Sequence, residues 1–281
     1  MRGFKKGKYL NGGFDLKWRV ALIQMDVIFG DPFKNREKVS ALLSDQELDG
    51  VDVIVLPELW STGYDLASLP ELCHEHQQED VQFMQQLAQS HHSMVVGGSI
   101  AFEKDGHYFN QMMVINRDGS IEKEYRKIHL FRLMNEEKYL SEGQTNGYFS
   151  LENIPCSGFI CYDIRFPEWI RTHVLKGSKV LFTVAEWPLA RIDHWRTLLI
   201  SRAIENQCFV IACNRVGTDP DNEFGGHSLV IDPWGQVLHE GDTYSEEVMI
   251  TDIDLNDVEK IRQRIAVFDD RRPEMYTSWL D

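Results

Sequence analysis

The sequence predicts an α/β protein in which helices pack outside β-sheets. Strand-type and helix-type apolar patterns alternate along almost the whole chain. Some strands are continuous apolar runs, typical of strands buried on both faces, whereas others pair as hairpins. The 281 residues, 43% of them hydrophobic, suffice for one large core, and no linker rich in Pro, Gly or Ser divides them. We therefore expect residues 18–281 to form a single domain.

The basic stretch before residue 18 is expected to lie outside that domain. The start of the chain, MRGFKKGKYLNGGFDL, has no apolar core after its charges and so does not resemble a secretory signal. We interpret residues 1–17 as a loose N-terminal extension.

The first half of the domain alternates strands with helices. We expect strands at residues 18–27, 51–58 and 93–100, and helices at 34–45 and 80–92. Residues 109–127 then read as two strands joined by a turn at Asp118 and Gly119, because an Asp-Gly pair favours a tight hairpin.

The second half repeats this alternation. The expected strands cover residues 157–163, 179–187, 207–216 and 247–255, with a further hairpin inside 225–240. The expected helices cover residues 167–177 and 191–206, and a last one starts near residue 256. Pro167 opens the first of these helices and Gly177 closes it, as is usual for the two helix ends.

Charge and cysteine usage exclude several function classes. A net charge of −15 argues against nucleic acid and anionic membrane surfaces as partners, because both select basic patches. No apolar run approaches the roughly 18 residues that a membrane span needs. The five cysteines form no C-x-x-C pair and the ten histidines show no metal-binding spacing, so we expect no disulfide framework and no metal. A reducing cytoplasm is the expected compartment.

Three polar residues stand at the ends of three expected strands. Glu58 follows an apolar run, Lys127 ends the second strand of the 109–127 hairpin, and Cys161 ends the strand that begins at residue 157. Ligand sites of open α/β sheets gather at the carboxyl ends of strands, so these side chains can meet. Taken singly, each has an ordinary alternative: a solvated glutamate, a surface lysine and a buried cysteine.

Together the three residues form a coherent nucleophilic site. Glu58 would take the thiol proton of Cys161 as general base and pass it to a leaving amine. Lys127 and the backbone N–H of Tyr162 would hold the oxyanion of the tetrahedral intermediate. The product of the first half-reaction would be a thioester at Cys161, which water activated by Glu58 then hydrolyses.

The segments LPELWSTGYD around Glu58, YRKIHLF around Lys127 and CYDIRFPEW at Cys161 resemble the three signature blocks of the nitrilase superfamily, the carbon–nitrogen hydrolases. This resemblance implies a four-layer α-β-β-α sandwich, a Glu–Lys–Cys triad, no metal or cofactor, and homodimers. It also implies a second glutamate that helps to position the amine or the water. Glu136 matches the family spacing better than its neighbour Glu137.

Four further segments, GGSI, YRKIHLFR, EWPLARIDHW and SRAIENQCFVIACNRVG, resemble the ω-amidase subgroup of that superfamily. The resemblance implies hydrolysis of the terminal amide of short 2-oxo acids such as 2-oxoglutaramate or 2-oxosuccinamate. The products would be ammonia and a dicarboxylic 2-oxo acid. Other members of the superfamily act on other bonds, so a carbamoyl-amine hydrolase, an aliphatic amidase and a nitrilase stay open, as does a catalytically silent binding scaffold.

A small anionic amide needs a local cation in so acidic a protein. Arg191 and Arg132 are the candidates for the substrate carboxylate, because the planar guanidinium matches a carboxylate; a structural ion pair is the alternative for each. Arg165 is expected to be structural and to tie down the turn that carries Cys161.

Aromatic residues near the three blocks are candidates for the pocket wall. We expect Trp60, Tyr64 and Trp187 there, with core packing as the alternative for Trp187. His129 lies two residues after Lys127 and would share its face on a strand, from where it would support the site by a hydrogen bond.

Overall fold

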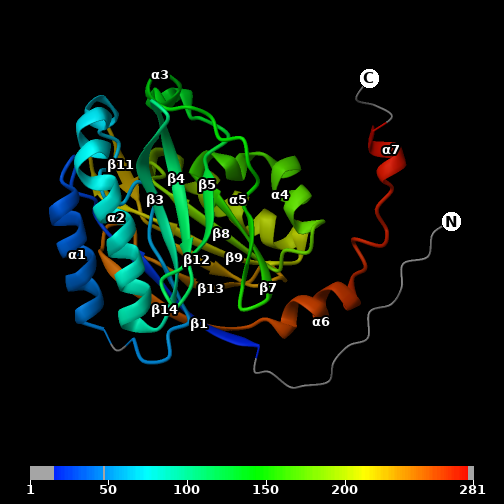
Figure 1. Ribbon diagram of the computed structural model, residues 1–281. Coiled ribbons are helices and arrows are strands. Elements are labelled where there is room, and N and C mark those ends of the chain that lie inside the picture. Colours follow the sequence, from blue (N-terminus) through cyan, green and yellow to red (C-terminus); the bar gives the residue numbers. More distant parts are fainter. Residues whose placement is uncertain (1–15, 47, 278–281) are drawn as a thin grey trace.

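The computed structural model describes residues 16–46 and 48–277, and it is a sandwich of two sheets with helices on both outer faces (Figure 1). Almost all of the expected N-terminal extension falls outside the described residues. The four-layer α-β-β-α expectation is confirmed. Within the described ranges no helix is both long enough and apolar enough to cross a membrane.

The first sheet has six strands in the order β14-β1-β2-β3-β4-β5. Its strands are β1 (Lys17–Gln24), β2 (Val53–Val55), β3 (Met94–Lys104), β4 (His107–Ile115), β5 (Ile121–Arg126) and β14 (Glu247–Asp254). Strands β1, β2 and β3 run parallel, and two antiparallel pairings return β5 to the same direction. The carboxyl ends of β2, β3 and β5 therefore lie at one edge.

The second sheet also has six strands, in the order β13-β12-β9-β8-β7-β6. Its strands are β6 (Tyr148–Leu151), β7 (Ile154–Ile160), β8 (Val180–Ala185), β9 (Phe209–Asn214), β12 (Leu229–Ile231) and β13 (Val237–Glu240). The central strands β7, β8 and β9 are parallel, so their carboxyl ends also share an edge. A separate hairpin joins β10 (Val216–Thr218) to β11 (Glu223–Gly225).

Helices cover the outer face of each sheet. Helices α1 (Pro32–Ser44) and α2 (Leu69–His91) pack on the first sheet, and α4 (Pro167–Val174) and α5 (Ile192–Asn206) pack on the second. The chain ends in α6 (Asn256–Arg264) and the short α7 (Pro273–Thr277). Helices α1, α2, α4 and α5 each bury apolar side chains against their sheet, which is the arrangement expected for amphipathic helices on a sheet.

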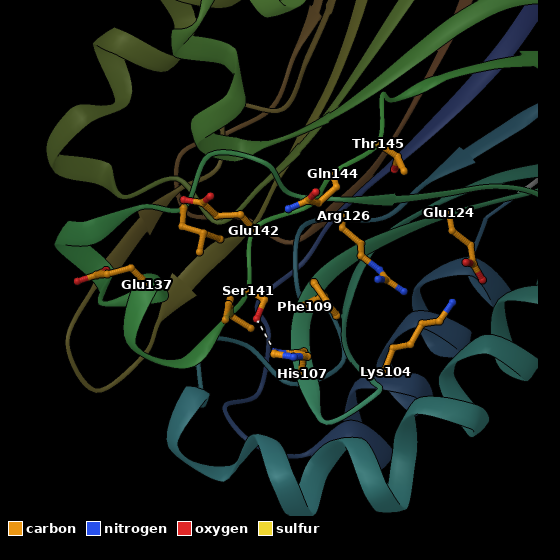
Figure 2. Close-up of a pocket in the computed structure, with 12 residues that line it drawn as sticks. Lys104, His107, Phe109, Glu124, Arg126, Glu137, Ser141, Glu142, Gln144 and Thr145 are labelled. Carbon is orange, nitrogen blue, oxygen red and sulfur yellow. Dashed lines mark hydrogen bonds between the residues drawn. The ribbon is translucent and has the colours of Figure 1, made fainter.

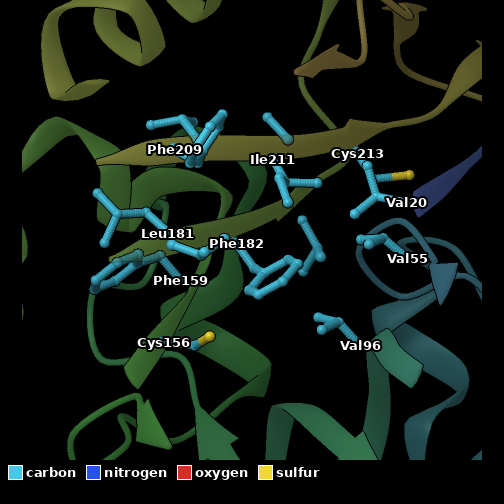
Figure 3. Close-up of a cluster of buried hydrophobic side chains, with 14 of the residues drawn as sticks. Val20, Val55, Val96, Cys156, Phe159, Leu181, Phe182, Phe209, Ile211 and Cys213 are labelled. Atoms are coloured by element: carbon cyan, nitrogen blue, oxygen red, sulfur yellow. The ribbon is translucent and has the colours of Figure 1, made fainter. Parts of the chain in front are cut away.

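The main core lies between the two sheets. Val20, Val55 and Val96 of the first sheet face Phe182 and Ile211 of the second (Figure 3). Side chains alternate along a strand, so the neighbouring residues of the same strands point to the helices instead. Both faces of the parallel strands are thus buried, which explains their unbroken apolar sequences.

Most expected elements are present, with shifted ends. Helix α2 begins at Leu69 rather than near residue 80, and β2 is only Val53–Val55, so Glu58 lies in the loop after it. Strand β1 begins at Lys17, the last residue of the expected extension. The edge strand β6 and helix α7 were not expected from the sequence.

Candidate active site

The three strand-end residues meet where the two sheets face each other. Glu58 and Lys127 follow β2 and β5 at one edge of the first sheet, and Cys161 follows β7 of the second sheet. Glu58 and Lys127 are fully buried, and Cys161 is 4% exposed. Nζ of Lys127 donates to Oε1 of Glu58 at 2.8 Å, and the charges of both residues act on the Cys161 thiol.

Cys161 has a left-handed backbone, with φ of +44°, at the start of a short 3-10 helix, η3 (Cys161–Arg165). Such a conformation is costly for a non-glycine residue and is tolerated where the surroundings impose it. Here the carboxylate of Asp163 accepts hydrogen bonds from the N–H of Ile160 at 3.0 Å and from the hydroxyl of Tyr125 at 2.7 Å. The turn is therefore held from both sides, and it separates Cys161 from the regular geometry of β7.

The carboxylate of Glu58 is bonded unequally at its two oxygens. Oε1 accepts from Nζ of Lys127 at 2.8 Å, from Nδ2 of Asn110 at 2.8 Å and from the hydroxyl of Tyr64 at 3.0 Å. Oε2 accepts from the backbone N–H of Glu186 at 2.8 Å. A carboxylate oxygen has about two lone pairs, so Oε2 keeps capacity to accept a further proton.

The second glutamate of the site is Glu136. Its Oε1 lies 2.7 Å from Nζ of Lys127 and accepts from the hydroxyl of Tyr64 at 2.9 Å, so Lys127 bridges two buried carboxylates. Glu137 is exposed and lines a groove on the surface instead. Glu136, and not Glu137, therefore reaches Lys127, from the short helix α3 (Glu136–Tyr139).

Burial sets the resting protonation of the site. Burial, with added repulsion from Glu58, holds the pKa of the Cys161 thiol well above its usual value, although Lys127 opposes the shift. The thiol of Cys161 is therefore neutral at rest, and a base would have to remove its proton before it could react as a thiolate. Burial alone would lower the pKa of Lys127, but the carboxylates of Glu136 and Glu58 raise it, so Lys127 stays charged.

A small cavity of about 10 Å³ opens beside Cys161. Its lining residues are Phe131, Met134, Cys161, Tyr162, Arg165, Trp187, Pro188 and Arg191. They include two arginines and no carboxylate. The volume matches about one water molecule. Arg165 stacks over Trp187 at 4.7 Å and Arg191 over Phe131 at 5.4 Å, so both guanidinium groups are part of the wall.

The arginines near the site lie in different surroundings. Arg165 lines the cavity, whereas the expectation made it a tie for the cysteine turn. That tie is Arg202 of α5, a buried residue whose Nε donates to the carbonyl of Ile164 at 3.0 Å. Arg132 is exposed and is absent from the cavity lining, whereas Arg191 lies where it was expected.

The aromatic candidates divide between wall and core. Trp187 lines the cavity, and the Tyr64 hydroxyl bonds to both Glu58 and Glu136. The prediction that Trp60 forms part of the wall is wrong. Its ring packs against Phe83 in the core between the first sheet and its helices, because there the large ring is fully buried and its Nε1–H reaches a carbonyl.

His129 supports the site indirectly, as predicted for a hydrogen-bonding role, and does not line the cavity. Its Nδ1 lies 2.8 Å from Asp163 and its ring stacks on Phe166 at 3.6 Å. Through its bond to Asp163, His129 helps to hold the turn that carries Cys161.

Sequence reasoning missed Asn110, Asp163 and Glu186. Each bonds to Glu58 or to the cysteine turn. Asp163 stands inside the CYDIR block and Glu186 directly after an apolar strand, the same signal that singled out Glu58. Asn110 carries no such signal because it lies within β4.

A larger groove of about 690 Å³ lies on the surface beside β4 and β5 (Figure 2). It is lined by Phe109, Arg126 and Glu124, among others, with Arg126 stacked over Phe109 at 4.1 Å. None of its lining residues belongs to the Glu58, Lys127 and Cys161 set. Size therefore does not identify the reactive pocket; the chemistry at Cys161 does.

Within the described ranges no group of three or more His, Cys, Asp or Glu side chains is arranged to hold a metal ion. The arrangement at Cys161 is that of a thiol, a base and a cation. Such a set can form and hydrolyse an acyl–enzyme intermediate.

Comparison with known proteins agrees with this geometry. The carbon–nitrogen hydrolase family matches residues 19–263. A 2-oxoglutaramate amidase from Bacillus subtilis is 51% identical over 261 residues, which cover 93% of this chain and 100% of that protein. An omega-amidase from Homo sapiens is 31% identical over 270 residues, covering 92% and 96% of the two chains.

Solved structures agree as well. A CN-hydrolase superfamily protein from Xanthomonas campestris, with an arsenic adduct in its active site, has a TM-score of 0.84 and 30% identity over 91% of this chain and 98% of its own. A carbon–nitrogen hydrolase from Helicobacter pylori has a TM-score of 0.88 and 26% identity over 95% and 99%. The chain therefore belongs to the carbon–nitrogen hydrolase family of the nitrilase superfamily and is a hydrolase of carbon–nitrogen bonds.

Proposed function

We propose that this protein is a cysteine-dependent amidase that hydrolyses the terminal amide of a short 2-oxo acid, 2-oxoglutaramate or 2-oxosuccinamate. The observation that carries the proposal is the cavity at Cys161, whose wall holds two arginines and no carboxylate. The 51% identity to a 2-oxoglutaramate amidase supports the same substrate class.

The acylation half-reaction starts at the neutral thiol. As Sγ of Cys161 attacks the amide carbon, the thiol proton moves to Glu58. The C–N bond then breaks, Glu58 returns the proton to the leaving nitrogen, and ammonia departs. Lys127, charged and held between two carboxylates, and the backbone N–H of Tyr162 stabilise the oxyanion.

The deacylation half-reaction uses the same groups in reverse order. Glu58 takes a proton from water, the resulting hydroxide attacks the thioester carbon, and the C–S bond breaks to release the acid. Glu136 helps to hold the amine or the water, because its carboxylate, like that of Glu58, is bonded to Nζ of Lys127. Cys161 regains its proton from Glu58, so no cofactor enters the cycle.

Arg165 and Arg191 make the enzyme specific for an anionic amide. A 2-oxo acid amide carries a carboxylate at the end away from the amide. The guanidinium forks of the cavity wall match that carboxylate in shape and charge. Trp187 and Phe131 keep the two guanidinium groups in place by stacking.

The test is ammonia release from 2-oxoglutaramate beside glutamine, asparagine, N-carbamoyl putrescine, a simple aliphatic amide and a nitrile, with Cys161→Ala as the blank. We expect strong turnover of the 2-oxo acid amide alone. Activity only on another compound would agree with the proposed triad but would show that the substrate is not a 2-oxo acid amide. No activity on any of them, with an unreactive Cys161, indicates a binding scaffold.

We further propose that the protein is a cytoplasmic homodimer. The five cysteines are all unpaired, which fits a reducing compartment. Ile204 of α5 and Trp234 of the β12–β13 turn are about half exposed, and Leu238 and Ile265 are also exposed. Exposed apolar side chains of this size suit an interface with a second copy. Light scattering tests this: Trp234→Asp should shift a dimer toward monomer, and a monomeric wild type overturns it.

A further inference from the structure

Glu186 is a buried carboxyl group that the mechanism above does not use. It follows β8, is fully buried, and donates its backbone N–H to Oε2 of Glu58 at 2.8 Å. Its own side chain accepts from Nη1 of Arg215 at 3.1 Å through Oε2, whereas Oε1 has no hydrogen-bond partner among the described residues. An isolated buried oxygen of this kind is rare in a structural ion pair.

Arg215 fixes the position of Glu186. It follows β9, the neighbour of β8, and its guanidinium is fully buried over the ring of Phe224 at 4.2 Å. Nη2 donates to the carboxylate of Asp26 and to the carbonyl of Val27, each at 2.8 Å. With this many partners the guanidinium cannot turn, so the Glu186 side chain and its peptide are held in one place.

The adjacent residue is held in the same manner. The N–H of Trp187 donates to Oδ1 of Asn214 at 2.7 Å, and Nδ2 of Asn214 donates to the carbonyl of Gly226 at 2.8 Å. The pair Glu186-Trp187 after β8 is thus held by the pair Asn214-Arg215 at the end of β9. Glu186 orients Glu58, the proposed general base, and Trp187 forms part of the cavity wall.

We infer that Glu186 is a positioning residue for Glu58: its backbone N–H fixes the oxygen that receives the thiol proton, and its side chain, when ionised, strengthens Glu58 as a base. This inference rests on the proposed role of Glu58. A negative charge beside Glu58 raises the proton affinity of Glu58, so more of the proton shared with Cys161 resides on the carboxylate. The thiolate population of Cys161 rises with it.

The charges that act on Glu186 come from several segments. Burial raises the pKa of Glu186 to about 8, with Arg215 opposing the shift and Glu58 and Asp219 adding to it. Glu186 in turn acts on Tyr64, which bonds to Glu58 and Glu136. The next charged groups are Lys127, which is bonded to Glu58, and Asp26, which is bonded to Arg215. The side chain therefore changes charge close to neutral pH.

The test reads Cys161 directly and needs no amide substrate. The rate of alkylation of Cys161 by iodoacetamide is measured by mass spectrometry from pH 6 to 9 in wild type, Glu186→Gln, Glu186→Asp and Asp80→Asn. Asp80 is the matched control, because it is also a buried carboxyl paired with an arginine, Arg36, on the helix side of the first sheet. Melting temperatures of all variants are recorded.

We expect wild type and Glu186→Gln to react at the same rate at pH 6, where Glu186 is protonated. At pH 9 we expect wild type to react at least about threefold faster, the effect of one nearby charge. Glu186→Asp should keep this pH dependence, and Asp80→Asn should follow wild type.

A ratio of wild type to Glu186→Gln that stays constant with pH overturns the inference and leaves Glu186 as a counterion of Arg215. The alkylation rate of wild type alone should also rise in a step near pH 8. Absence of this step overturns the inference even if Glu186→Gln does not fold. Because alkylation is independent of the amide, a wild type that fails to hydrolyse 2-oxoglutaramate bears only on the proposed substrate.

Discussion

At the scale of single residues, Cys161 is the side chain whose removal separates chemistry from stability. Cys161→Ala should abolish ammonia release and lower the free energy of unfolding by only about 1 kcal/mol, because the group removed is small and borders a cavity. Cys156→Ala is the matched control: Cys156 is buried on β7, the strand that leads to Cys161, and the variant should keep turnover. Loss of folding in Cys161→Ala alone would make the thiol structural.

Lys127 is the shared cation of two buried carboxylates, and the proposed mechanism also gives it the oxyanion. Lys127→Met leaves the carboxylates of Glu58 and Glu136 buried without their shared cation. We expect a loss of about 3–5 kcal/mol in the free energy of unfolding and a fall of about 100-fold or more in kcat. Urea unfolding and steady-state kinetics check both.

The control for Lys127→Met is Lys179→Met, which breaks a partly exposed pair with Glu259. It should cost less than about 1 kcal/mol and leave kcat unchanged. A rise in KM with unchanged kcat in Lys127→Met would contradict the oxyanion role.

At the scale of elements, strand β3 positions the loop that carries Glu58. Its register shifts between Val96 and Ser99, and the loop is held to Ser99, whose Oγ accepts from the N–H of Leu59 at 2.9 Å. The bulge requires Gly98: its φ is +57°, and a Cβ there would lie 1.9 Å from the carbonyl oxygen of Pro57. The backbone of β3 and the base loop are therefore in direct contact.

Gly98→Ala should destabilise the protein by about 3 kcal/mol or more and lower kcat, since the strained backbone and the clash both displace the loop. Gly106→Ala isolates the two causes, because Gly106 also has a positive φ of +78° but open space around it. It should cost only about 1 kcal/mol. Equal melting temperatures of the two variants would show that the contact with Pro57 is unimportant.

At the scale of the whole molecule, buried carboxyl groups make stability depend on pH. Burial raises the pKa of Glu186 from 4.5 to about 8, and it also raises the pKa of Glu136. Between pH 4.5, the ordinary pKa of a glutamate, and about pH 8, these carboxyl groups bind more protons in the folded protein than in the unfolded chain. The free energy of unfolding therefore falls as pH rises from about 5 to 8. Urea titrations at pH 5, 6.5 and 8 measure the slope.

Glu186→Gln removes one of these protons and should make the slope shallower, whereas Asp118→Asn should not, because Asp118 is an exposed carboxyl with a lowered pKa. Stability that rises toward pH 8 in the wild type would contradict the burial argument.

Strand periodicity predicts the alternation of strands and helices because it is a local signal, whereas the four layers follow from the resemblance of the three sequence blocks to the nitrilase superfamily. Glu58, Lys127 and Cys161 each lie one to three residues after the end of a strand. Trp60 and Arg165 were misplaced for a different reason: each lies beside a reactive residue in the chain, but the direction of a side chain in a loop depends on contacts from other segments. Asn110 and Arg202 reach the site only through tertiary packing, which no local pattern encodes.

The narrow cavity at Cys161 has a kinetic consequence. A space that holds about one water molecule cannot admit a five-carbon amide, so its wall has to part before the reaction. Phe131 and Met134 of that wall lie on the same short segment as Glu136, and the N–H of Phe131 donates to Glu136. Movement of this segment to admit substrate would also withdraw Glu136 from Lys127. Binding of the amide and assembly of the reactive centre would then occur in the same step. The open form without substrate would be inactive toward amides that do not induce closure.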